Sequence, residues 1–199
     1  MSLRIIGGEF RGRVLQSPKG AFTRPLLGQA REAIFDILGP RIEGAEVWDL
    51  FAGTGATGIE ALSRGAARVS FVEKARQAID VLRDNLALLG ESALARSRVV
   101  RGDAWDPPLA AEDGTPPAPP DLVFLDPPYA LVAEDPSKAV WRAHELLART
   151  TGRGVVCFHF EAGQLDEDDF DGAVDLRRYG RCGIALLSRA AAAEAPAAD

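Results

Sequence analysis

A four-residue motif, Asp126-Pro127-Pro128-Tyr129, combines a carboxylate, two rigid residues and an aromatic ring. Each proline fixes its own φ and favours an extended residue before it, so Asp126 should leave its strand in one direction on a stiff backbone. The carboxylate and the Pro127 carbonyl then offer two hydrogen-bond acceptors, and the Tyr129 ring offers a stacking wall. These groups match a planar heterocycle with an exocyclic NH2 group, whose lone pair they would direct at an electrophile. We therefore predict that Asp126, Pro127, Pro128 and Tyr129 form a catalytic site.

A glycine-rich turn, Gly53-Thr54-Gly55-Ala56-Thr57-Gly58, follows the apolar run 47–51, and Glu73 stands twenty residues after the first glycine. Glycines let a ligand approach backbone amides at a helix N-terminus, and a carboxylate that ends the second strand can accept hydrogen bonds from ribose hydroxyls. NAD and S-adenosylmethionine both carry an adenosine that fits this pattern. Asp49 favours S-adenosylmethionine, because a carboxylate just before the turn repels a pyrophosphate but attracts an ammonium or sulfonium group.

The third strand is expected to add a further carboxylate to the cofactor site. Asp103 ends this strand, where it can accept a hydrogen bond from the adenine amino group. The predicted cofactor-binding residues are Asp49, Phe51, Gly53, Thr54, Gly55, Glu73, Asp103 and Ala104. With a methyl donor beside the amine, an in-line displacement needs mainly positioning. No metal site is expected, because no Cys or carboxylate stands at metal-ligand spacing from His144 or His159, and we interpret both histidines as structural.

Alternating strands and helices are expected to position these residues. The expected strands are 47–51, 69–73, 98–103, 122–126 and 155–160, and the clearest helical stretches between them are 75–89 and 139–147. These strands are apolar throughout, which indicates a parallel sheet covered on both faces. We therefore predict a doubly wound α/β fold from about Gly44 onward. Residues 173–187 predict an antiparallel hairpin at one edge of the sheet.

The charge distribution divides a chain of 199 residues with a net charge of −6. Residues 1–31 carry six Arg and Lys side chains against Glu9 alone, which indicates a localised anionic partner. The length predicts one domain with small appendages, and we divide it into a basic extension (1–43), the α/β domain (44–189) and a disordered tail (190–199). Both cysteines lie in apolar runs and are interpreted as buried reduced thiols. No run is long enough to span a membrane and no signal peptide is evident, so we expect a cytoplasmic protein.

The motifs together resemble a known group of enzymes. Asp49-Leu-Phe-Ala-Gly-Thr-Gly55 with Asp126-Pro-Pro-Tyr129 resembles the amino-methyltransferase branch of the S-adenosylmethionine-dependent enzymes. The stretch from Arg4 to Arg13, with Arg24-Pro25 and residues 31–35, is similar to the bacterial 16S ribosomal RNA guanine-N2 methyltransferase family. The resemblance runs from about residue 3 to 187. It implies a Rossmann-like class I methyltransferase sheet of seven strands, with the last strand antiparallel and a basic N-terminal extension that grips RNA.

The resemblance implies methyl transfer from S-adenosylmethionine to the N2 amine of a flipped guanine in 16S ribosomal RNA. Arginines of the N-terminal region would contact phosphates bidentately, namely Arg4, Arg11, Arg13, Arg24 and Arg31. The low overall basicity suggests that the partner is RNA within a small-subunit particle. We also expect a monomer and no membrane partner. One stretch departs from the family: Leu26-Leu27-Gly28-Gln29 replaces a Thr-Thr-Asp-Arg-like sequence, which removes a helix-capping group and a positive charge.

Three alternatives remain open from the sequence. The same chemistry could methylate adenine N6 in DNA or RNA, or a protein side-chain amide. Asp rather than Asn before Pro127 argues against the amide, and the lack of a separate target-recognition domain argues against DNA. A nicotinamide-dependent oxidoreductase would need a catalytic His, Tyr and Lys constellation that is not evident. A non-catalytic RNA-binding assembly factor would keep this fold, although the intact motif argues against it.

Overall fold

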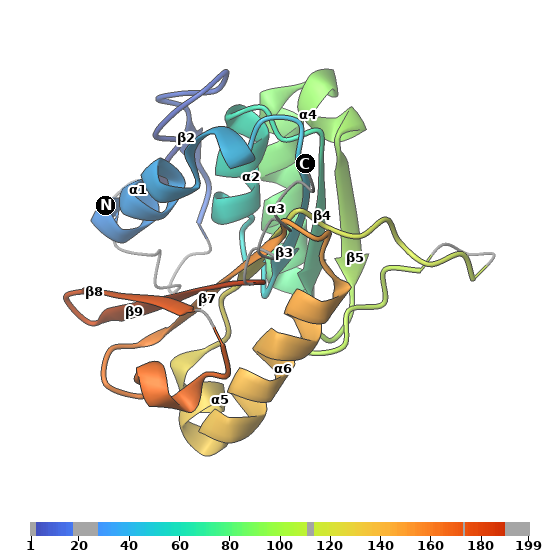
Figure 1. Cartoon of the computed structure of the whole chain (residues 1–199). Helices are drawn as coiled ribbons and strands as arrows, with labels where there is room; N and C mark the ends of the chain where they lie inside the picture. The colour runs from blue at the N-terminus through green and yellow to red at the C-terminus, as the bar shows by residue number, and fades with distance from the viewer. Residues whose placement is uncertain (1–2, 18–27, 111–113, 173, 190–199) are drawn as a thin grey trace, which may run out of the picture.

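A computed structural model describes residues 3–17, 28–110, 114–172 and 174–189. A mixed sheet of seven strands forms the centre of the protein (Figure 1). The strand order is β5-β4-β3-β6-β7-β9-β8. The strands are β3 (Glu46–Leu50), β4 (Arg68–Glu73), β5 (Ser97–Arg101), β6 (Leu122–Leu125), β7 (Val155–Glu161), β8 (Val174–Tyr179) and β9 (Cys182–Ser188). The first five run parallel, whereas β9 is antiparallel to both β7 and β8. The predicted doubly wound sheet with an antiparallel hairpin at one edge is confirmed.

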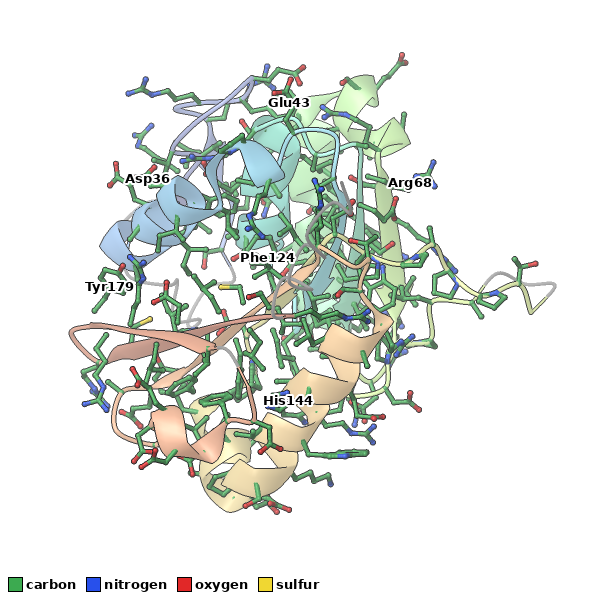
Figure 2. All side chains as sticks on the ribbon, in the orientation of Figure 1. Asp36, Glu43, Arg68, Phe124, His144 and Tyr179 are labelled. Carbon is green, nitrogen blue, oxygen red and sulfur yellow. The ribbon has the colours of Figure 1, made fainter. Side chains whose placement is uncertain are left out.

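Helices cover both faces of this sheet. They are α1 (Gly28–Leu38), α2 (Ala56–Ser63), α3 (Arg76–Leu89), α4 (Glu91–Ala95), α5 (Tyr129–Glu134) and α6 (Pro136–Arg149), with short 3-10 turns η1 (Gly39–Arg41) and η2 (Glu167–Asp169). Helices α1, α2 and α3 share one apolar core with the sheet, and α5 and α6 share a second one. Phe35 of α1 packs on Phe124 of β6 in the first core, with ring centroids 5.5 Å apart. Figure 2 labels Phe124.

The strands are apolar on both faces because each face is covered. Along β3, Val47 points into the first core, whereas Trp48 and Leu50 point into the second. Such two-sided burial is what continuous apolar runs predict. Boundaries differ slightly from expectation: the strand expected at 98–103 ends at Arg101, and α6 is longer than the stretch 139–147.

The N-terminal segment folds against helix α2. Strand β1 (Leu3–Arg4) pairs antiparallel with β2 (Val14–Leu15), and apolar side chains of this segment enter the first core. The carboxylate of Glu60, which is completely buried, accepts hydrogen bonds from the backbone amides of Ile6 and Gly7, both at 2.8 Å. Hydrogen bonds from backbone amides of residues 3–17 to the Glu60 side chain therefore hold this segment on the α/β body. The expected division of the chain at residues 43 and 44 stays a prediction.

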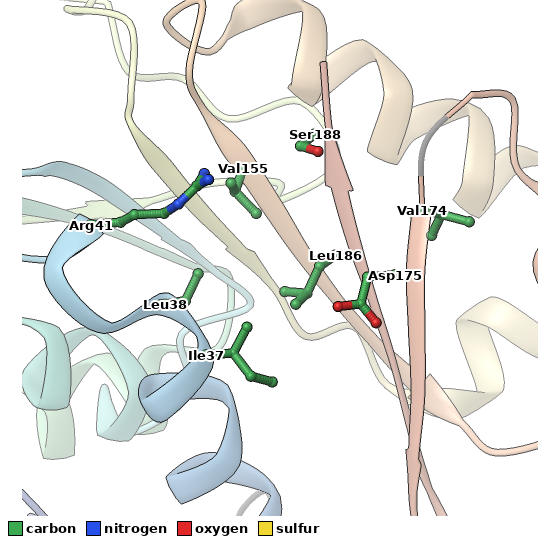
Figure 3. A pocket seen from close by; sticks show the side chains of 8 residues that line it. All are labelled: Ile37, Leu38, Arg41, Val155, Val174, Asp175, Leu186 and Ser188. Carbon is green, nitrogen blue, oxygen red and sulfur yellow. The ribbon is translucent and has the colours of Figure 1, made fainter. Parts of the chain in front are cut away.

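A pocket opens between α1, η1 and the hairpin edge of the sheet, at the end where β7 begins and β9 finishes (Figure 3). It is lined by Ile37, Leu38, Arg41, Val155, Val174, Asp175, Leu186 and Ser188. Within the described ranges, no helix is long and apolar enough to cross a membrane, and no three or more His, Cys, Asp or Glu side chains gather in a way that could hold a metal ion.

Candidate active site

The candidate active site lies at the edge of the sheet where the parallel strands end. Strand β3 runs between β4 and β6, with Leu50 paired to Val72 on one side and to Leu125 on the other. The segments that follow these strands therefore meet: the glycine turn after β3, Glu73 at the end of β4 and Asp126 after β6. Open α/β sheets bind ligands beyond this edge. The sheet therefore brings the glycine turn and the predicted catalytic motif to the same edge.

The glycine turn needs left-handed backbone at three positions. Gly53 has φ of 54° and Gly55 has φ of 82°, and Phe51, at 59°, is the single non-glycine residue with positive φ in the described ranges. A Cβ added to Gly53 would make only an ordinary contact with the Phe51 carbonyl oxygen, at 4.0 Å, whereas one added to Gly55 would stand 2.1 Å from Leu82 Cδ1. Gly55 therefore serves close packing as well as its φ, while the side of the turn at Gly53 stays open to a ligand.

Asp49 is buried and hydrogen-bonded to the last glycine of this turn. Its side chain is buried, and Oδ2 accepts a hydrogen bond from the Gly58 amide at 2.8 Å. Burial raises the pKa of Asp49 well above its usual range; the Gly58 hydrogen bond opposes this, and the charges of Asp126 and Glu73 add to it. A negative charge at Asp49 is therefore costly unless a cation comes near. The expected attraction of the cofactor's positive end by Asp49 stays a prediction.

Glu73 is partly engaged by the backbone around it. Its Oε2 accepts a hydrogen bond from the Gly53 amide at 2.9 Å, and its Oε1 accepts two from the amides of Lys74 and Ala75, both at 2.8 Å. These bonds fix the carboxylate against the open side of the turn. Recognition of ribose hydroxyls by Glu73 stays a prediction, which the position of the side chain supports.

The end of β5 contributes an aromatic contact that the sequence did not indicate. Asp103 is exposed, and its Oδ1 accepts a hydrogen bond from the Trp105 amide at 2.9 Å, so it shapes the local turn. The Trp105 ring then packs edge-on against Phe51, with centroids 5.0 Å apart. Ala104, which stands between Asp103 and Trp105 in the sequence, is buried. Trp105, which is absent from the predicted cofactor residues, thus lies against the strained residue of the glycine turn.

The catalytic motif is joined to β7 by a histidine. Asp126 Oδ1 lies 2.5 Å from His159 Nδ1, and Tyr129 Oη lies 3.0 Å from His159 Nε2. The Asp126 side chain is 32% exposed, whereas His159 is buried. Gln164 also holds the motif, because its Nε2 donates to the Tyr129 carbonyl at 2.9 Å. His159 thus contacts both ends of the motif, and the sequence interpretation of this residue as structural stays a prediction.

Burial lowers the pKa of His159, but hydrogen bonds to Asp126 and Cys182 and the charges of both raise it more strongly, to about 9. At neutral pH, His159 is therefore an imidazolium beside the Asp126 carboxylate. Cys182, like Cys157, is a buried free thiol, in agreement with the sequence interpretation.

The predicted RNA-binding arginines occupy different environments. Arg4, Arg11 and Arg13 are exposed on the N-terminal segment, and Arg24 lies outside the described residues. Arg31 is only 4% exposed, and its Nη2 donates a hydrogen bond to the Arg4 carbonyl at 2.5 Å. The prediction that Arg31 contacts phosphate is therefore corrected, since this side chain joins α1 to the N-terminal segment inside the protein.

The family model described as Conserved hypothetical protein 95 matches residues 3–185. The chain belongs to this family. "Ribosomal RNA small subunit methyltransferase D" of Escherichia coli K12 is 42% identical over 127 residues, which are 64% of this chain and 60% of that protein. "Putative rRNA methyltransferase YlbH" of Bacillus subtilis is 39% identical over 130 residues, 64% of this chain and 67% of the relative. The aligned region thus spans less than two thirds of the E. coli relative. The resemblance to a bacterial 16S ribosomal RNA methyltransferase family is confirmed.

Solved structures support the same family and fold. "Putative methyltransferase yhhF from Escherichia coli" superposes with a TM-score of 0.69 and 32% identity over 94% of this chain and 97% of that one. The Thermus thermophilus 16S rRNA N2 G1207 methyltransferase (RsmC), solved with AdoMet and guanosine, has a TM-score of 0.72 over 96% of this chain and 50% of its own. Its identity of 22% shows the fold alone. Together with the strand order, these likenesses confirm the Rossmann-like class I methyltransferase fold.

Proposed function

We propose that the protein transfers a methyl group from S-adenosylmethionine to the exocyclic N2 amine of a guanine in 16S ribosomal RNA. The observation that carries this proposal is the partly exposed Asp126 carboxylate, held at the sheet edge beside the glycine turn. The names of the family's relatives support ribosomal RNA as the substrate class.

The residues around the turn fit S-adenosylmethionine. The backbone at Gly53 is uncrowded, with a single contact at 4.0 Å for an added Cβ, which leaves room for a ligand, and Glu73 is hydrogen-bonded to the Gly53 amide, where it can accept from ribose hydroxyls. Phe51 and Trp105 supply apolar surface for the adenine, and Asp49 supplies a buried carboxyl that favours a nearby cation. When bound, S-adenosylmethionine supplies an electrophilic methyl group.

Asp126 orients the target amine. His159 occupies Oδ1, so Oδ2 is the oxygen that accepts a hydrogen bond from the amine. The Pro127 carbonyl accepts the second amine hydrogen, Pro128 keeps the chain stiff, and the Tyr129 ring stacks on the base. As the bond between the nitrogen and the methyl carbon forms, the methyl–sulfur bond would break and leave S-adenosylhomocysteine. The nitrogen releases one proton, and the exposed part of the Asp126 carboxylate gives that proton a route to solvent.

The N-terminal segment positions the RNA. Arg4, Arg11 and Arg13 are exposed and contact phosphates, and Arg24 extends the same basic sequence. Because the whole chain has a net charge of −6, affinity for free RNA is limited. The substrate is therefore a small-subunit particle, which a monomer of the enzyme modifies.

The test is incubation of the purified protein with radiolabelled S-adenosylmethionine and 30S particles that lack the modification, followed by nucleoside analysis. Free 16S RNA and duplex DNA serve as alternative substrates. We expect N2-methylguanosine from the particles. Label in adenine or in protein would replace the guanine assignment, and cofactor binding without any turnover would favour the assembly factor.

A matched variant tests the role of the motif. Asp126→Ala should keep its affinity for S-adenosylhomocysteine, measured by calorimetry, and lose transfer by a factor on the order of 100 or more, because the amine is no longer positioned. Full methylation by this variant would show that Asp126 is not the orienting group.

A further inference from the structure

We propose that His159 is a positioning residue that bridges Asp126 and Tyr129 and so presents a single carboxylate oxygen, Oδ2, to the target amine. This inference rests on the proposed function and assigns a role to a residue outside the motif. It concerns orientation of the base-binding groups and not cofactor binding.

The sheet itself places the histidine opposite the motif. Strands β6 and β7 are parallel, and Leu125 pairs with Phe158. The next residues along the two strands are Asp126 and His159. Their neighbours two residues back, Phe124 and Cys157, belong to the first core, so both side chains point to the same face. The contact follows from the strand register and does not depend on a flexible loop.

Both ring nitrogens of His159 are engaged by the motif. Nδ1 is 2.5 Å from Asp126 Oδ1, Nε2 is 3.0 Å from Tyr129 Oη, and the rings of His159 and Tyr129 meet edge-on with centroids 5.3 Å apart. Rotation of the Asp126 carboxylate or of the Tyr129 ring would break one of these bonds inside the protein, where an unpaired polar group is costly. One rigid side chain therefore fixes both the acceptor and the stacking ring.

The charge of the histidine matches its surroundings. The groups that face it are Asp126 after β6, Tyr129 at the start of α5 and Cys182 on β9. Asp126 lies near enough to the buried Asp49 for its charge to raise the pKa of that carboxyl. An imidazolium at His159 donates from both nitrogens, to Asp126 Oδ1 and to the Tyr129 oxygen. With Oδ1 held by the histidine, Oδ2 is left to accept a hydrogen bond from an amine donor.

Two variants separate positioning from packing. His159→Phe keeps a ring of similar size and removes both hydrogen bonds, while His159→Asn restores one uncharged donor toward Asp126. We expect kcat to fall about 100-fold in His159→Phe and to recover in part in His159→Asn, with the dissociation constant for S-adenosylhomocysteine unchanged in both. The matched control is His144→Phe, because His144 lies on α6 and accepts a hydrogen bond from the Asp171 amide, outside the site (Figure 2).

A second readout does not need turnover. The chain has two histidines, so His144→Phe leaves one imidazole signal to assign in NMR spectra. We expect the signal of His159 to titrate near pH 9, and Asp126→Asn to move that midpoint to lower pH. An unshifted midpoint in Asp126→Asn would overturn the bridge.

The outcomes distinguish this inference from the proposed function. If the wild type forms no N2-methylguanosine, the proposed function fails, whatever the titration of His159. If the wild type is active and His159→Phe keeps kcat within about twofold, the positioning role is wrong. If His159→Phe does not fold, His159→Asn decides: a fall in kcat with equal loss of cofactor affinity and of thermal stability would show a structural role alone.

Discussion

The buried carboxylate of Glu60 should decide whether the N-terminal segment stays attached to the body of the protein. Glu60 accepts the amides of Ile6 and Gly7, and its Oε1 also accepts from Arg64 Nε at 2.9 Å. In Glu60→Ala, two partly buried amides and one guanidinium lose their acceptor. Each unsatisfied group costs about 1–3 kcal/mol, and partial access to water favours the lower end of this range. We expect a loss of about 3 kcal/mol in the free energy of unfolding.

Urea denaturation of the wild type and of Glu60→Ala measures this loss directly. For a chain of this length, it corresponds to a decrease of about 10 °C in the melting temperature. The matched control is Asp36→Ala, because Asp36 is the exposed partner of Arg64 at 3.8 Å and such surface pairs contribute less than about 1 kcal/mol. Equal stabilities of Glu60→Ala and Asp36→Ala would refute the assignment of Glu60 as the anchor.

Three further predictions follow from the site and its surroundings. Gly55→Ala forces a side chain onto φ of 82° and against Leu82, so both the melting temperature and the affinity for S-adenosylhomocysteine should fall; unchanged calorimetric binding would contradict this. His159 has its pKa raised from 6.5 to about 9, so its stabilisation is complete below the lower value and is lost as pH rises through the higher one. Urea denaturation of wild type and of His159→Asn should therefore show a difference in the free energy of unfolding that shrinks between about pH 6 and pH 10. A difference that stays constant with pH would refute the stabilisation by protonated His159. Arg11→Ala should weaken binding to 30S particles and lower the salt slope by about 1, whereas Arg31→Ala should mainly lower the melting temperature; the reverse pattern would restore Arg31 as a phosphate contact.

The meeting of the glycine turn, Glu73 and Asp126 was predictable because parallel strands end at one edge. The glycine turn, Glu73 and Asp126 each follow an apolar run, and those runs had to be neighbours in a doubly wound sheet. The contact of Asp126 with His159 was not predictable in this way. It depends on the register between β6 and β7, which are separated along the chain by α5 and α6, and the sequence of neither strand fixes that register alone.

The burial of Arg31 could have been predicted from helical spacing, although not from the charge count of the N-terminal sequence. The side chains of Ala30, Ile34, Phe35 and Leu38 are buried, and Arg31 stands four residues before Phe35 on the same stripe of α1. Helical spacing therefore indicated an inward arginine, whereas counting charges along the N-terminal sequence placed it with the surface arginines. Asn85 gives the same signal in α3, where it lies between Leu82 and Leu89 on the apolar stripe and is completely buried.

Asn85 connects the proposed RNA-binding segment with the glycine turn. Its Oδ1 accepts the Gln16 amide at 2.7 Å, and its Nδ2 donates to the carbonyls of Gln16 at 3.2 Å and Thr54 at 3.0 Å. Glu60 holds the other end of the same segment and belongs to α2, the helix that the glycine turn begins. The helices that shape the turn thus also hold the segment that carries Arg4, Arg11 and Arg13. The distance between the proposed phosphate contacts and Asp126 is therefore set by packed helices and buried hydrogen bonds, which would give the short basic segment the rigidity that the proposed selection of one base needs.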